Sequence, residues 1–282
     1  MNHPTKPLPS SRFRGDPENL STSVPIDPGA RRVPPFGGFN ATVLRIELKR
    51  MLRNRRTIVF TLVMPVVLYL IIGANDTYSS DREGSGNVSA YILISMAAYG
   101  AVLASTSGGA MVAAERALGW SRQLRLTPLS PLAHILTKAV VALSLGALSV
   151  VAVNIAGVLN GKADMPTHVW VAAALIAWLG SIVFGAFGLF MGYLLPSENV
   201  MQVLGPVMAG LAALGGLWFP IASDSVMGHI SAVTPIYGLA QLARWPLYGG
   251  APHAVWVLNL VGWLAVFVAG AAWRMSKDTA RV

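Results

Sequence analysis

The 282-residue sequence contains no cysteine and little charge, and each shortage excludes a class of protein. Without cysteine the chain can have no disulfide, no thiolate metal ligand and no cysteine nucleophile. Only 12% of the residues are charged, against about 25% in a soluble domain, whereas 54% are hydrophobic. The apolar residues also come in runs near the length of about 20 that crosses a bilayer. The composition therefore predicts a membrane protein with several spans.

Recognisable catalytic motifs are also missing. The sequence has no HExxH, no paired carboxylates and no Walker motif, and Gly157–Ala163 has the wrong spacing for a phosphate loop. The five histidines are scattered, so we expect no metal site. No predicted span carries a charged residue near its centre, which argues against a self-powered proton antiporter. We therefore expect neither an enzyme nor a bound cofactor.

The positive charge is concentrated in a few places. Of the 21 lysines and arginines, all but Arg82, Lys162 and Arg244 precede residue 57, lie within 114–138 or follow residue 273. Basic residues on alternate loops are the pattern of loops that face the cytoplasm. The net charge of +9 therefore indicates membrane topology, and we expect no nucleic-acid partner.

Two different segments precede the first apolar run. Residues 1–39 are rich in Pro, Ser, Gly and Arg without apolar periodicity, which predicts a disordered cytoplasmic leader. Residues 40–56 mix apolar and basic residues, which predicts an amphipathic interfacial helix bound to anionic lipid of the inner leaflet. Its cations are Arg45, Lys49, Arg50, Arg53, Arg55 and Arg56.

Residues 57–282 are predicted to form an all-α membrane domain of six transmembrane helices. The expected spans are 57–74, 88–113, 135–159, 168–195, 200–220 and 252–273. Six spans put both termini on one side, here the cytoplasm, in agreement with the basic character of both ends. The pair Gly188 and Gly192 and the small residues of 105–110 favour close helix packing.

A polar, basic loop at 114–131 separates the second and third spans. It reads E-R-x-x-G, four residues, then L-x-x-T-P-L, with Glu115 first and Leu129 last. This pattern resembles the first cytoplasmic loop of type-2 ABC exporter permeases, in the group similar to daunorubicin-resistance permeases. The resemblance covers residues 40–282 and includes an LWFP segment at Leu217–Pro220 and a P-x-Y segment at Pro235–Tyr237.

The resemblance implies that the loop is a coupling helix that docks on a separate ABC ATP-binding subunit. Two such subunits would carry the ATP and Mg²⁺. The docking residues would be Glu115, Arg116, Leu118, Gly119, Trp120, Arg122, Leu124, Arg125, Thr127 and Pro128. Trp120 departs from the smaller residue expected there. The 40–56 helix would also touch the ATPase, and Leu217, Pro220, Pro235 and Tyr237 would belong to a segment that gates exit.

The sequence thus predicts the permease subunit of an ATP-driven exporter in a bacterial inner membrane. It would act as a homodimer, or as a heterodimer with a second permease, and export an apolar or amphipathic drug, lipid or natural product. The alternative is a non-transporting scaffold or sensor whose 114–131 loop recruits a cytoplasmic partner. The plainest interpretation of that loop is a solvated, positively charged turn. We assign no residue to a substrate path.

Overall fold

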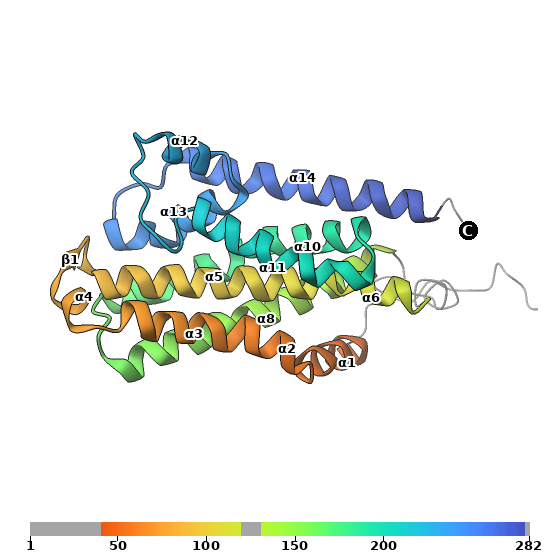
Figure 1. Cartoon of the computed structure of the whole chain (residues 1–282), viewed down its shortest axis with the longest axis horizontal. Coiled ribbons are helices and arrows are strands. Elements are labelled where there is room, and N and C mark those ends of the chain that lie inside the picture. The colour runs from red at the N-terminus through yellow and green to blue at the C-terminus, as the bar shows by residue number, and fades with distance from the viewer. Residues whose placement is uncertain (1–40, 120–130, 280–282) are drawn as a thin grey trace, which may run out of the picture. The chain divides into compact units, whose positions relative to one another are not determined.

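The computed structural model describes residues 41–119 and 131–279, and helices form nearly all of these two ranges (Figure 1). The predicted leader at 1–39 and the loop residues from Trp120 to Pro128 lie outside the described residues. The helices of the two described ranges follow the long apolar runs of the sequence, as expected where the backbone must satisfy its own hydrogen bonds.

The first described segment is a series of helical pieces. They are α1 (Ala41–Leu52), α2 (Arg55–Ile58), the π-helical η4 (Val59–Val63), α3 (Met64–Leu68) and the π-helical η5 (Tyr69–Gly73). The predicted 40–56 helix therefore ends early, because Asn54 interrupts it and its side chain accepts from the Thr57 amide at 3.4 Å. Pro65 lies in α3, between the two π-helical stretches. Because proline has no N–H for a regular helical bond, the α-helical pattern is interrupted around it.

The connection from 75 to 87 is more ordered than the polar loop that the sequence predicts. It contains α4 (Asp76–Ser80) and the antiparallel strands β1 (Arg82–Glu83) and β2 (Gly86–Asn87), with Arg82 opposite Asn87. The Asn75 side chain caps α4, and the Asn87 side chain caps α5 by accepting from the Ala90 amide at 2.9 Å.

The central helix is α5 (Val88–Ala110), which contacts most of the bundle. It continues into α6 (Val112–Ala117) and packs against α8 (Pro131–Asn160) and α10 (Ile182–Leu194), while α9 (Thr167–Gly180) precedes α10. The predicted small-residue packing is confirmed, because a Cβ on Gly188 would lie 2.1 Å from the Thr106 carbonyl oxygen. Only glycine allows this close approach of α10 to α5.

The last third of the described chain covers one side of α5 and α10. It consists of α11 (Ser197–Leu214), α12 (Val226–Ala232), α13 (Pro235–Tyr248) and α14 (Ala254–Thr279). The apolar stretch of α14 is only 11% buried, against 78% for that of α5. An apolar helix so little covered by protein is suited to contact lipid or another subunit.

Within residues 41–119 and 131–279, four helices are long and apolar enough to cross a membrane. They are Val88–Ala117, Ala133–Asn160, Thr167–Leu194 and Ala254–Lys277, which match the second, third, fourth and sixth predicted spans. The first predicted span contains a shorter apolar helix, Val59–Gly73, and the fifth corresponds to α11. The count of six and the location of the termini stay predictions.

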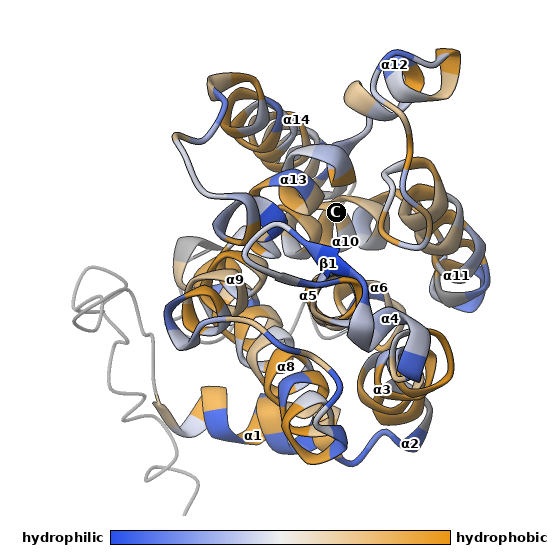
Figure 2. Ribbon diagram, turned by 90° about the vertical axis from the view of Figure 1, so that its left-hand side faces the viewer, coloured by the Kyte–Doolittle hydropathy of each residue, from blue (hydrophilic) through white to orange (hydrophobic). Residues whose placement is uncertain are grey.

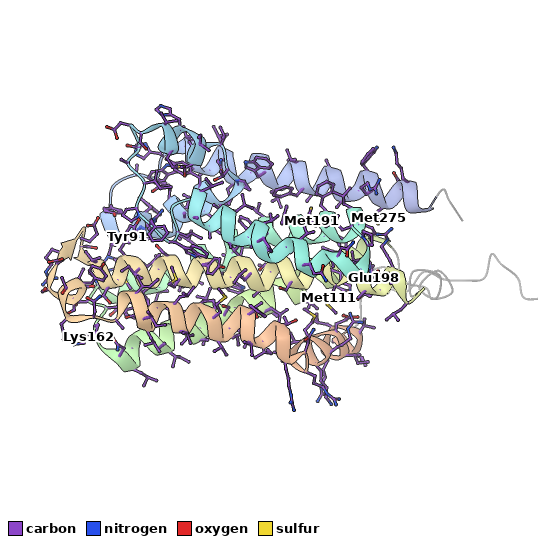
Figure 3. The ribbon with its side chains drawn as sticks, in the orientation of Figure 1. Tyr91, Met111, Lys162, Met191, Glu198 and Met275 are labelled. Carbon is purple, nitrogen blue, oxygen red and sulfur yellow. The ribbon has the colours of Figure 1, made fainter. Side chains whose placement is uncertain are left out.

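The two ends of the bundle differ in character. Figure 2 looks onto the end that carries α4 and β1, where hydrophilic residues gather in front of mostly hydrophobic helices. Tyr91 and Lys162 lie toward this end, whereas Met111 and Glu198 lie toward the other (Figure 3). That second end carries α1 and α6, and the described part of the sequence motif begins in α6.

Candidate functional site

The described part of the motif is built around Glu115, which points into the protein. Its side chain is 4% exposed, and its Oε1 atom accepts from Arg50 Nη2 of α1 at 2.6 Å. The same oxygen accepts from Lys138 Nζ of α8, another buried side chain. Glu115 therefore joins α6 to two helices that are distant in sequence.

A second carboxylate completes this group, which we call the ion cluster: Glu47, Arg50, Glu115 and Lys138. Glu47 Oε2 lies 3.1 Å from Arg50 Nη2 and 3.2 Å from Lys138 Nζ. His134 stands beside the cluster, with Nε2 3.9 Å from Glu115 Oε2. That oxygen is buried and has no hydrogen-bond partner among the described residues.

The ion cluster balances two negative charges against two positive ones. Desolvating a single unpaired charge costs several kcal/mol, so Glu115 and Lys138, each 4% exposed, depend on the other members. Removing one partner of such a pair leaves a buried charge uncompensated and costs roughly 3–5 kcal/mol. The arrangement consequently favours one position of α6 relative to α1 and α8.

Arg116 connects α6 to a third helix. Its Nη1 donates to the backbone carbonyls of Gly192 at 3.1 Å and Tyr193 at 3.0 Å. These carbonyls lie in the last turn of α10, where the helix leaves acceptors unused and its dipole favours a cation. The guanidinium also lies over the Tyr193 ring, 5.6 Å from its centroid. Two neighbouring residues of the motif thus bind α6 to different parts of the bundle.

The glycine of the motif ends the helix. Gly119 has φ +69°, and its amide donates to the Arg116 carbonyl at 3.1 Å. Glycine is favoured in this left-handed conformation just after a helix. Leu118 before it is 78% exposed, so an apolar side chain is presented where the loop begins. The E-R-x-x-G pattern therefore encodes two contacts to the bundle and a helix stop.

The cations of residues 41–55 divide into two groups. Arg45, Lys49, Arg53 and Arg55 are exposed, whereas Arg50, with a side chain that is 40% exposed, belongs to the ion cluster. Another face of α1 carries Leu44, Leu48 and Met51, which pack against Ala104, Val141 and Leu145. Spacings of four and three residues place these three side chains on one stripe. The contact of α1 with lipid stays a prediction.

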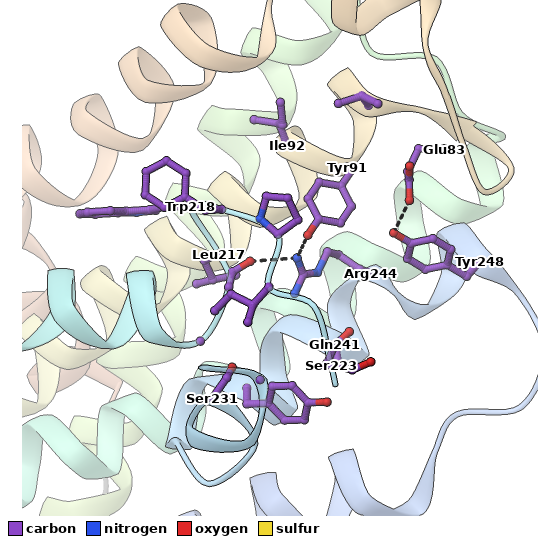
Figure 4. A pocket seen from close by; sticks show the side chains of 18 of the residues that line it. Glu83, Tyr91, Ile92, Leu217, Trp218, Ser223, Ser231, Gln241, Arg244 and Tyr248 are labelled. Carbon is purple, nitrogen blue, oxygen red and sulfur yellow. Dashed lines mark hydrogen bonds between the residues drawn. The ribbon is translucent and has the colours of Figure 1, made fainter. Parts of the chain in front are cut away.

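Three of the four predicted exit-gate residues meet at a cavity of about 580 Å³. Leu217, Pro220 and Tyr237 line it, together with Arg244 and residues of α4, α5 and α12 (Figure 4). Pro235 does not line the cavity but forms the first turn of α13, where its missing N–H costs nothing. The gating role itself stays a prediction.

Sequence reasoning missed several functional candidates. Glu47 has a signal, since it is the lone acid in a basic helix and stands three residues before Arg50. Lys138 lies at the start of the predicted third span, and the sequence gives no sign of its ion pairs with Glu47 and Glu115. Arg244 is one of three cations outside the basic loops, which marks it as unusual without revealing its surroundings.

The direct contact of Glu115 with another subunit stays a prediction, although its burial gives it a role inside this chain. The direct contact of Arg116 with another subunit also stays a prediction. Leu118 and Gly119 lie at the surface of the described part. Trp120, Arg122, Leu124, Arg125, Thr127 and Pro128 lie outside the described residues, as does the side chain of Arg56.

Comparison with known proteins agrees with the helical architecture and the motif. Residues 40–248 match the family described as "ABC-2 type transporter". Over 225 residues the chain is 25% identical to the protein named "Putative transport permease YvfS" of Bacillus subtilis (strain 168). That alignment covers 79% of this chain and 91% of the relative. The protein therefore belongs to the ABC-2 type transporter family, whose members are multi-pass, non-catalytic components of membrane transport that work with an ABC ATP-binding partner.

Proposed function

We propose that this protein is the membrane-spanning subunit of an ATP-driven exporter in a bacterial inner membrane. Two copies of the chain, or one copy and a related permease, pair with two ATP-binding subunits that hold the ATP and Mg²⁺. The 114–131 loop docks on those subunits as a coupling helix. The cargo is an apolar or amphipathic drug, lipid or natural product, as for the daunorubicin-resistance group that the motif resembles.

The observation that carries this proposal is the ion cluster. A force on the loop reaches α6 first, and the bonds from Glu115 to Arg50 and Lys138 pass it directly to α1 and α8. Arg116 passes it to α10. Because buried ion pairs are costly to break, these helices move with α6 instead of letting the loop bend alone. Such a junction suits a protein that converts movement of a docked ATPase into tilting of its spans.

A second cavity supports the proposed cargo. It measures about 550 Å³ and lies among η4, α5 and α11, within the apolar part of the bundle. Phe60, Met64, Tyr99, Leu204 and Met208 line it with three threonines. Apolar walls with a few hydroxyl groups are typical of sites for drug-sized amphipathic molecules.

Affinity purification of the tagged full-length chain tests the docking. In mild detergent we expect an ABC ATP-binding subunit to copurify in equal amount. The double reversal Arg122→Glu and Arg125→Glu should abolish this association while leaving expression intact. The matched control reverses Arg274 and Lys277, two cations near the C-terminal end of α14, and should retain the partner.

Reconstitution then separates transport from recruitment. A transporter couples ATP hydrolysis to its cargo, so an amphipathic solute should stimulate hydrolysis by the reconstituted complex. If no added solute changes the rate of ATP hydrolysis by the complex, or if the chain copurifies with a non-ATPase partner, the result would support the scaffold or sensor instead. An unchanged association after the Arg122 and Arg125 reversals would refute the docking loop.

A further inference from the structure

The cavity of about 580 Å³ contains a buried cation that the coupling mechanism does not use. Arg244 of α13 is 4% exposed, and its guanidinium lies 4.7 Å from the centroid of the Tyr91 ring. Its Nη1 donates to the Tyr91 hydroxyl and, at 3.0 Å, to the Gly216 carbonyl, while Nε donates to the Ala240 carbonyl. Figure 4 shows Arg244 beside Tyr91 among the lining residues.

The charge of Arg244 is not neutralised within the described part of the protein. All three of its acceptors are uncharged oxygens, and no described carboxylate forms an ion pair with it. No described residue accepts a hydrogen bond from Nη2. A guanidinium with an unused donor edge and no counter-ion is a costly group to bury, and it suits bidentate binding of a carboxylate or phosphate.

The one acidic residue among those that line the cavity is engaged elsewhere. Glu83 of β1 accepts from the Tyr248 hydroxyl at 2.6 Å. Partial burial and this bond raise the pKa of Tyr248, so its hydroxyl stays protonated and holds Glu83. Glu83 is also partly exposed, which lets water screen its charge.

The rest of the cavity wall is largely apolar. Ile72, Trp218, Phe219 and Ile221 are among the aromatic and aliphatic residues that line it. The Trp218 indole Nε1 itself is buried, so the ring contributes apolar surface. The site thus combines a cation and an apolar surface in a volume that fits a small amphiphile.

We propose that this cavity binds the anionic headgroup, phosphate or carboxylate, of an amphiphilic molecule, with Arg244 as its principal ligand. The headgroup accepts from Arg244, and the attached chain lies against the apolar wall that includes Trp218. The proposed export function suggests that this molecule is cargo. Only the cargo role rests on that function, and the binding itself does not. Binding can be tested without transport.

The test measures the binding of dodecyl phosphate to the full-length chain in nanodiscs of zwitterionic lipid, through tryptophan fluorescence. Dodecyltrimethylammonium, with the same chain and the opposite charge, is the comparison. We expect a saturable change with at least tenfold tighter binding of the phosphate, and loss of most of this signal in Trp218→Phe. Arg244→Gln should weaken binding at least tenfold, Arg244→Lys less, and the exposed control Arg82→Gln not at all.

Two further measurements make the outcome decisive. Competition by inorganic phosphate would show that a free anion suffices, whereas its failure would show that the alkyl chain is required. Equal affinity of wild-type protein for the two amphiphiles would overturn the proposal, even if Arg244→Gln fails to fold. Tight, charge-selective binding without stimulated ATP hydrolysis would keep the site and reject its cargo role.

Discussion

Two adjacent residues, Glu115 and Arg116, form the described side-chain hydrogen bonds between the motif helix and the rest of the bundle. The acid binds cations of α1 and α8, and the base binds the last carbonyls of α10. The two side chains could not exchange positions, because the cations of α1 and α8 need a carboxylate and the end of α10 needs a hydrogen-bond donor. The order of the two charges in the motif therefore follows from the helices that surround them.

The substitution Glu115→Gln tests the ion cluster at this scale. It leaves Lys138 and Arg50 with one carboxylate, that of Glu47, so we expect a stability loss near the lower end of roughly 3–5 kcal/mol. Thermal unfolding of the purified protein in detergent measures this loss. We expect stimulated ATP hydrolysis by the assembled complex to fall as well.

Controls for this substitution come from the same chain. Glu198→Gln removes an exposed acid from the first turn of α11 and should change stability by no more than about 0.5 kcal/mol. The double variant Glu115→Gln and Lys138→Met removes one charge of each sign, so it should be more stable than Glu115→Gln alone. A Glu115→Gln protein as stable as wild type would show that the cluster does not fix α6.

At the scale of elements, the Asn87 side chain joins α4, α5 and the α8–α9 connection at the end opposite the ion cluster. Its Nδ2 donates to the carbonyls of Ser79 and Lys162, at 3.0 and 2.8 Å. Its Oδ1 accepts from the amides of Ala90 and Asp164, at 2.9 and 3.1 Å. One amide side chain thus uses both donors and accepts twice, which caps α5 and ties its start to the α8–α9 connection.

The substitution Asn87→Ala should consequently be more harmful than loss of a single cap. Losing the cap costs about 1 kcal/mol, and each partner left buried and unsatisfied adds about 1–3 kcal/mol. Asn75→Ala is the matched control, because Asn75 caps only the short α4. Thermal unfolding compares the two variants. An equal loss in both would mean that the Asn87 network contributes no more than a helix cap.

The elements differ in how far the sequence could predict them. Long apolar runs predict α5, α8, α14 and the joined α9 and α10, and the Gly188–Gly192 spacing predicts the α5–α10 contact. The break at Asn54 and the β1–β2 hairpin escape prediction, because one side-chain hydrogen bond accompanies the first and backbone pairing of two-residue strands forms the second. No apolar periodicity records such bonds.

The functional site, too, could be predicted only in part from the sequence. The motif marks Glu115 and Arg116 as important, but it assigns them to a partner surface. Their partners within the described chain include Lys138 and the last carbonyls of α10, which lie 23 and 76–77 residues away in sequence. Contacts at this range depend on how the helices pack, so the sequence alone indicates the residues without the interactions.

At the scale of the whole molecule, charge separates the two ends of the described bundle. Nine lysines and arginines with described side chains lie within residues 41–55, on α6, in the first turns of α8 and at the end of α14. The opposite end has only Arg82, Lys162 and Arg244 among its described residues, and the first two pair with Asp164 and Asp76. From the positive-inside rule we predict that the α1 end faces the cytoplasm.

Cysteine labelling tests this orientation directly, because the natural chain contains no cysteine to give a background. Ser80→Cys lies at the end of α4, and Leu118→Cys lies just after α6, so the two sites mark opposite ends of the bundle. In intact cells a membrane-impermeant maleimide should label Ser80→Cys and should label Leu118→Cys only after permeabilisation. The reverse pattern would place the ion cluster outside the cell, where no ATP-binding subunit could reach the loop beside it, and would reject the coupling mechanism together with the orientation.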